Sequence, residues 1–235
     1  MTVPEGAPSA SDLLDLFDWR RTVADLYTEV RRIAARDPEA GWHRWRGARD
    51  RLFREHPQSP IPASRRSTFD GVGYFPYDPA YRVLGATEPT ERDHIDVAGS
   101  DGGSYGFTRF ATVAFELLGE PRTFGCYWLD GYAGGLFVSF RDATSGRGTY
   151  GAGRYLLDTA KGADLGAGPD GRLVLDFNFS YNPSCSYDPR WACPLAPPEN
   201  RLGVPVEAGE RLGPRAPSGP SGGPGTSPGP PVPPT

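Results

Sequence analysis

The sequence has little of several residue types that mark whole classes of proteins. Lys161 is the only lysine and Met1 the only methionine, so arginine carries almost all of the positive charge. Three cysteines, Cys126, Cys185 and Cys193, are too few and too odd in number for a disulfide framework, and we expect free thiols in a reducing compartment. No run of about 18 apolar residues occurs, which argues against a membrane-spanning helix.

The chain also lacks the features of an exported or nucleic-acid-binding protein. Its first residues contain no basic segment, apolar stretch or cleavage site of a secretory signal, so we expect a cytoplasmic protein. The net charge of -4 gives no electrostatic reason to expect nucleic acid or an anionic membrane surface as a partner. We therefore predict neither.

The first part of the chain contains two amphipathic helical segments. Ser11 is a suitable N-cap, and apolar residues from Leu16 to Ile33 recur at spacings of three and four. Asp37 followed by proline starts a second helix. We predict a helical hairpin over residues 11–55 that packs on the protein's own sheet, in a monomer or in a weak homodimer formed through helix 11–36.

From about Phe69 the pattern changes to short β-branched and aromatic runs separated by turn residues, which is typical of an antiparallel sandwich or barrel. We predict an α+β fold dominated by antiparallel β-structure. In it the helical hairpin packs on a closed or nearly closed barrel or sandwich of seven or eight strands. The candidate strands are Tyr81–Leu84, His94–Val97, Gly106–Leu118, Arg122–Leu129, Leu136–Arg141, Gly153–Leu157 and Arg172–Tyr181.

The predicted domain organisation follows from these changes of pattern. One globular domain should span residues 11–212, with its β-rich body over residues 69–182 and a proline-rich strap over residues 183–212. The flanking segments, residues 1–10 and the Pro-, Gly- and Ser-rich residues 213–235, have too little apolar surface to fold, and we expect both to be disordered.

Strict alternation in the last predicted strand separates two faces. Leucine and aromatic side chains share one face, whereas Asp176, Asn178, Ser180 and Asn182 share the other. This polar row faces solvent in the simpler interpretation. If the sheet closes into a barrel, the same row forms one wall of a ligand site, with the strap as its roof.

The strap itself carries a distinctive motif. Residues 182–187 read Asn-Pro-Ser-Cys-Ser-Tyr, and residues 193–202 read Cys-Pro-Leu-Ala-Pro-Pro-Glu-Asn-Arg-Leu. This run resembles the C-terminal signature of an uncharacterised prokaryotic family, the domain of unknown function 1684 family. Residues 56–60, 74–76, 140–142 and 149–156 also look like that family, and the resemblance extends from about Trp19 to Gly209. It implies no established activity and assigns no catalytic residue.

The leading functional hypothesis is therefore binding of a small polar metabolite between the last strand and the strap. Hydrolysis there would use Asp176 and Glu199 as a carboxylate pair. The alternative is a non-catalytic structural or protein-interaction module. The candidate ligand-binding residues are Asp176, Asn178, Asn182, Tyr187, Glu199, Asn200, Tyr150 and Arg154.

The cysteines are weak candidates for a metal or catalytic site. Seven residues separate Cys185 from Cys193, which is wider than the spacing of structural zinc sites, and no histidine lies nearby in sequence. We predict no metal, and the sequence identifies no cofactor. A Cys185, His94 and Asn178 arrangement for nucleophilic catalysis has no local support. A disulfide between the two strap cysteines is expected only if they act as a redox pair.

Overall fold

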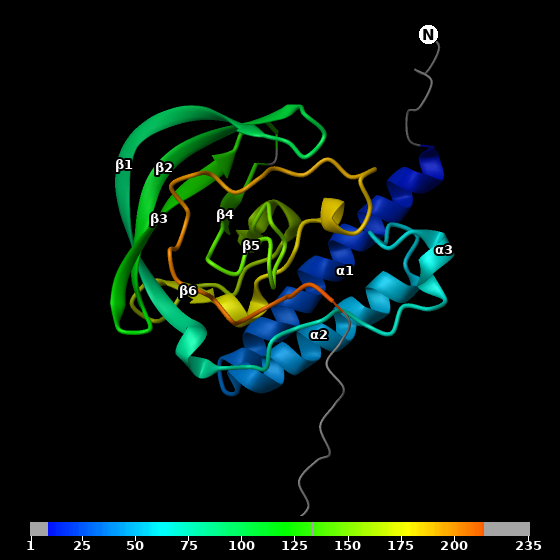
Figure 1. Ribbon diagram of the computed structural model, residues 1–235, viewed down its shortest axis with the longest axis horizontal. Coiled ribbons are helices and arrows are strands. Elements are labelled where there is room, and N and C mark those ends of the chain that lie inside the picture. Colours follow the sequence, from blue (N-terminus) through cyan, green and yellow to red (C-terminus); the bar gives the residue numbers. More distant parts are fainter. Residues whose placement is uncertain (1–8, 133, 214–235) are drawn as a thin grey trace, which may run out of the picture.

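The computed structural model describes residues 9–132 and 134–213, so most of the predicted disordered segments, residues 1–10 and 213–235, lies outside the described residues. Helices α1 (Ala10–Ala34) and α2 (Pro38–Glu55) form a hairpin beside the sheet, as predicted (Figure 1). Helix α1 begins slightly earlier than expected because Ser9, not Ser11, caps it in a capping box with Asp12. Asp37 caps α2 as predicted by accepting the Ala40 N–H at 2.9 Å.

The sheet is antiparallel and has six strands in the order β5-β4-β3-β2-β1-β6. The predicted number of seven or eight was too high because the first two candidates are the two ends of one long strand. The strands are β1 (Arg82–Ala98), β2 (Ser104–Leu117), β3 (Glu120–Leu129), β4 (Leu136–Phe140), β5 (Arg154–Asp158) and β6 (Leu173–Asp176). The short helices are α3 (Ala63–Arg66), η1 (Pro79–Tyr81), η2 (Thr159–Lys161), η3 (Phe177–Phe179) and η4 (Ser184–Ser186).

A two-residue turn joins β2 to β3. Leu117 pairs with Glu120, so the turn consists of Leu118 and Gly119, which have φ angles of 54° and 82°. Such turns require positive φ at both central residues because their twist matches that of the flanking strands. Gly119 adopts this conformation without cost, whereas Leu118 does so as an exposed, strained residue.

The predicted continuous strand over Arg172–Tyr181 is wrong. Strand β6 ends at Asp176, and η3 redirects the chain before Tyr181 pairs with Tyr155 of β5, through hydrogen bonds of 2.8 and 3.1 Å. The 3-10 turn thereby moves the chain from β1 to the other edge of the sheet, and the barrel nearly closes. Strict alternation is lost there, so Phe177 enters the barrel core while Phe179 packs against the helices.

The barrel interior is filled by side chains, including three from the strap: Leu202, Val206 and Ala208. The strap crosses the barrel and then returns to the hairpin, where residues 209–211 bond the backbone of residues 73–75 (Figure 1). A second apolar cluster lies between the hairpin and the barrel and is built around Trp42, Trp45 and Phe179. No helix in residues 9–132 or 134–213 has the length and apolar character needed to cross a bilayer.

Candidate functional site

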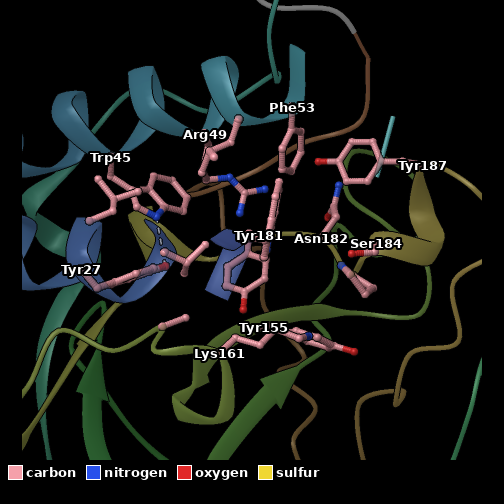
Figure 2. A pocket seen from close by; sticks show the side chains of 16 residues that line it. Tyr27, Trp45, Arg49, Phe53, Tyr155, Lys161, Tyr181, Asn182, Ser184 and Tyr187 are labelled. Atoms are coloured by element: carbon pink, nitrogen blue, oxygen red, sulfur yellow. Dashed lines mark hydrogen bonds between the residues drawn. The ribbon is translucent and has the colours of Figure 1, made fainter. Parts of the chain in front are cut away.

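A partly enclosed pocket lies where the helical hairpin meets the closing edge of the barrel (Figure 2). Its volume is about 70 Å³, which is room for roughly five water molecules or a small organic molecule. Wider grooves of about 580 and 860 Å³ elsewhere on the described surface are more open. The pocket is lined mainly by aromatic and aliphatic side chains, among them Trp19, Val23, Tyr27, Trp45, Leu52, Phe53, Tyr155, Tyr181 and Tyr187.

Arg49 of α2 supplies a buried positive charge to this pocket. Its guanidinium carbon lies 4.9 Å from the ring centroid of Trp45, 4.8 Å from that of Phe53 and 4.9 Å from that of Tyr181. Figure 2 shows the guanidinium reaching from the helix toward Tyr181. Cation–π contacts among desolvated rings fix both its position and its charge.

Glu210, near the end of the strap, balances Arg49 from behind the pocket wall. Its carboxylate accepts a hydrogen bond from Arg49 at 2.9 Å, one from the Asn182 N–H at 3.0 Å and one from the Tyr187 hydroxyl. Glu210 is only 1% exposed. Burial raises its pKa, although Arg49 and these hydrogen bonds act in the opposite direction. The network ties the hairpin, the end of the barrel and the strap together.

Lys161 supplies a second positive charge, at the pocket mouth. Its ammonium lies 2.9 Å from Asp158, which also accepts a hydrogen bond from the Tyr181 hydroxyl at 3.3 Å. Although desolvation opposes it, the charge of Asp158 raises the pKa of Lys161, so the side chain stays protonated at neutral pH. The Lys161 side chain is half exposed and can reorient toward a ligand.

One polar atom at the pocket lacks a partner. Asn182 Oδ1 is buried without a hydrogen bond within the described part of the chain. Buried polar atoms are normally hydrogen-bonded, and an orphan beside a cavity indicates a place that a ligand or ordered water fills. Asn182 lines the pocket.

The comparisons with known proteins identify a family and leave its activity open. The family model described as a protein of unknown function (DUF1684) matches residues 67–211. The chain belongs to this family. It is also similar to an uncharacterised protein of Haloarcula marismortui whose solution NMR structure is known, with 38% identity and a TM-score of 0.55 over 76% of this chain and 96% of that one. No curated protein matches this chain.

This DUF1684 chain places the predicted site residues in several separate networks. Asn182 and Tyr187 reach the pocket, whereas Asp176, Asn178 and Arg154 are not among its lining residues. Asp176 accepts hydrogen bonds from the Asn178 N–H at 3.0 Å and from Arg82 at 3.0 Å. It caps η3 and is buried, with a pKa raised by burial despite these partners. The Asn178 side chain bonds both backbone groups of Asp78.

Glu199 and Asn200 serve the barrel. Glu199 accepts a hydrogen bond from the hydroxyl of Tyr127. The Asn200 side chain forms hydrogen bonds with the backbone of Gly125 and Ser139. Asp176 and Glu199 therefore have separate partners at separate strands, and the predicted carboxylate pair is not formed.

Tyr150 and Arg154 likewise lie away from the pocket. The Arg154 guanidinium is fully buried, pairs with Asp142 at 2.5 Å and donates to the carbonyl oxygens of Val206 and Ala208. It anchors the strap to β5. The Tyr150 hydroxyl lies 3.6 Å from the Cys185 sulfur.

Sequence reasoning missed Arg49, Lys161 and Glu210. A signal existed for one of them: Lys161 is the only lysine in a chain otherwise rich in arginine. Nothing local in the sequence separates Arg49 from the charged residues around it, so the helix pattern alone gives no sign of its burial. No group of three or more His, Cys, Asp or Glu residues with metal-binding geometry occurs in residues 9–132 and 134–213.

Proposed function

We propose that this protein binds a small carboxylate with a short branched or cyclic apolar body in the pocket between the hairpin and the barrel. One observation carries the proposal. The cations Arg49 and Lys161 line the pocket, while their carboxylate partners Glu210 and Asp158 stand behind its wall. A ligand therefore meets positive charge and aromatic rings, which complement an anionic head on an apolar body.

The pocket volume limits the size of this ligand. An isovalerate molecule combines one carboxylate with a branched four-carbon chain, and isovaleramide has the same shape without the charge. With so few ligand atoms, we expect a dissociation constant on the order of 1 mM for isovalerate. Loss of the charge should weaken binding about tenfold or more.

The only lysine makes the test direct. Reductive ¹³C-methylation labels Lys161 and the terminal amine, whose dimethylamine signals differ, so NMR follows one side chain at the pocket mouth. Titration with isovalerate should move the Lys161 signal saturably, and titration with isovaleramide should not. Lack of saturation by isovalerate in the folded protein would refute the proposal.

A pair of variants provides the controls, both read by ligand-observed NMR. Val23→Phe places a ring into the pocket from α1 and should abolish binding of isovalerate while the protein remains folded. Lys161→Gln should weaken binding of isovalerate and leave the weak response to isovaleramide unchanged. Equal weakening for both compounds would show that charge is not what the pocket recognises.

A cytoplasmic location belongs to the same proposal, supported by the three free cysteines. The proposal is limited to binding, because neither Asp176 nor Glu199 of the predicted carboxylate pair lines this pocket.

A second candidate function rests on helix α1. Leu13, Leu14 and Phe17 are 53, 67 and 60% exposed near its N-terminus, which favours an interaction module that pairs weakly through residues 11–36. Light scattering after size exclusion tests this: Leu14→Ser should abolish a concentration-dependent dimer, and a monomer at every concentration would exclude the dimer.

A further inference from the structure

Two cysteines of the strap face one another beside the pocket, outside its lining. Cys185 lies in η4 and is half-buried, while Cys193 is 5% exposed. The Cys185 N–H donates to the Cys193 sulfur at 3.4 Å, and the two side chains hydrogen-bond to each other. The seven residues between them in sequence therefore form a loop that brings the two cysteines together.

Polar groups surround this pair of thiols. The Tyr150 hydroxyl lies 3.6 Å from the Cys185 sulfur, and Ser100 beside the pair donates its hydroxyl to the Trp191 carbonyl oxygen at 3.2 Å. Ser100 also accepts the Cys193 N–H at 3.1 Å, which holds the second cysteine in place. Donors directed at a sulfur atom stabilise its thiolate form, and a thiolate is the form that reacts.

The two sulfur atoms differ in protonation. The hydrogen bond from Cys193, supported by Ser100 and Tyr150 and opposed by burial, lowers the pKa of Cys185 to about 6. The same hydrogen bond and burial raise the pKa of Cys193. Cys126, buried in the barrel core, has its pKa raised by burial to about 12, so it provides an internal control.

We propose that Cys185 and Cys193 form a peroxide-reactive dithiol site, in which Cys185 attacks and Cys193 resolves. The Cys185 thiolate attacks one oxygen of hydrogen peroxide, the O–O bond breaks, and hydroxide leaves and takes up a proton as water. Cys185 is then a sulfenic acid. The Cys193 sulfur attacks the Cys185 sulfur, the S–O bond breaks, and a second water leaves with the proton of Cys193. Peroxide is reduced, and the two thiols are oxidised to one disulfide.

The accessibility of the site limits the oxidant to a small one. Cys185 is half-buried, whereas Cys193 is buried, so a molecule of the size of hydrogen peroxide reaches the first sulfur more easily than a bulky disulfide would. Closing the disulfide needs little movement because the Cys193 sulfur already lies 3.4 Å from the backbone nitrogen of Cys185.

A tryptic map tests the proposal without any variant. Cleavage after Arg190 separates Cys185, in residues 173–190, from Cys193, in residues 191–201, and Cys126 lies in residues 123–141. After treatment of the reduced protein with one equivalent of hydrogen peroxide, we expect residues 173–190 and 191–201 to be joined by a disulfide. Residues 123–141 should keep a free thiol, with oxidation at least about tenfold slower.

Matched variants assign the two roles. Cys193→Ser should accumulate a sulfenic acid on Cys185 that dimedone traps, and Cys185→Ser should show neither product. Circular dichroism checks that both variants fold, and if one does not, the native map alone decides. Reaction of Cys126 at the same rate as Cys185, or absence of the linked peptides, would overturn the proposal.

Discussion

The replacement Asn200→Ala tests whether this residue holds the barrel together or binds a ligand. Strands β3 and β4 pair only at Tyr127↔Phe137 and Trp128↔Leu136, and they separate toward Gly125 and Ser139. The Asn200 amide bridges that gap. It accepts the Gly125 N–H at 2.7 Å and donates to the carbonyl oxygens of Gly125 and Ser139 at 3.1 and 3.0 Å.

The magnitude follows from the number of groups left without partners. Asn200 has no exposed surface, so water does not replace the lost amide in the folded state. Each orphaned buried backbone group costs about 1–3 kcal/mol. With partial relaxation we expect the free energy of unfolding to fall by about 3–4 kcal/mol, a large share of the roughly 5–15 kcal/mol that keeps a domain folded.

Urea unfolding followed by circular dichroism measures this loss. Arg201→Ala is the matched control, because that side chain is exposed on the same strap segment and its removal should change stability by less than about 0.5 kcal/mol. Binding of isovalerate by folded Asn200→Ala should be unchanged. A loss below about 1 kcal/mol, or a folded variant that has lost isovalerate binding, would refute the structural role.

Three further outcomes follow from the structure. Asp176→Asn should lower the free energy of unfolding by about 1–3 kcal/mol, because the amide leaves Arg82 without the acceptor that it has at 3.0 Å, and it should leave isovalerate binding unchanged. Loss of binding at unchanged stability in urea would restore the predicted ligand role. Leu118→Gly should raise the free energy of unfolding by about 0.5–1 kcal/mol in the same assay, since glycine relieves the positive φ, and a decrease would show that the exposed leucine packs favourably. For Glu210, burial raises the folded-state pKa above its ordinary value of 4.5, so its contribution to stability is full below that value and falls as pH rises through the folded-state pKa. The stability difference between the native protein and Glu210→Gln should therefore shrink from about pH 4 to about pH 7, and a difference that grows would contradict the raised pKa.

Local sequence signals determined the helical hairpin and the antiparallel character of the body. Asp37 followed by proline set the start of α2, because capping and the fixed φ of proline act within one turn. Hydrophobic spacing and turn residues likewise indicated a β-rich body after Phe69. These features need only neighbours along the chain, so a sequence contains them directly.

Only the tertiary structure decided what the polar residues do. The chain has three asparagines, all predicted to bind ligand and all buried: Asn178 and Asn200 bond distant backbone, while Asn182 leaves one oxygen free at the pocket. The break at η3 separated Asn178 from Asn182, and alternation along a strand could not foresee it.

The pocket is a tertiary feature for the same reason. Arg49 donates a hydrogen bond to Glu210, which lies 161 positions later in the sequence. Lys161 reaches the same pocket from the end of β5. Charged residues on a helix have the same local pattern whether they face water or a buried partner. Burial and partner choice depend on which distant segments pack there, and that is settled only when the barrel closes against the hairpin.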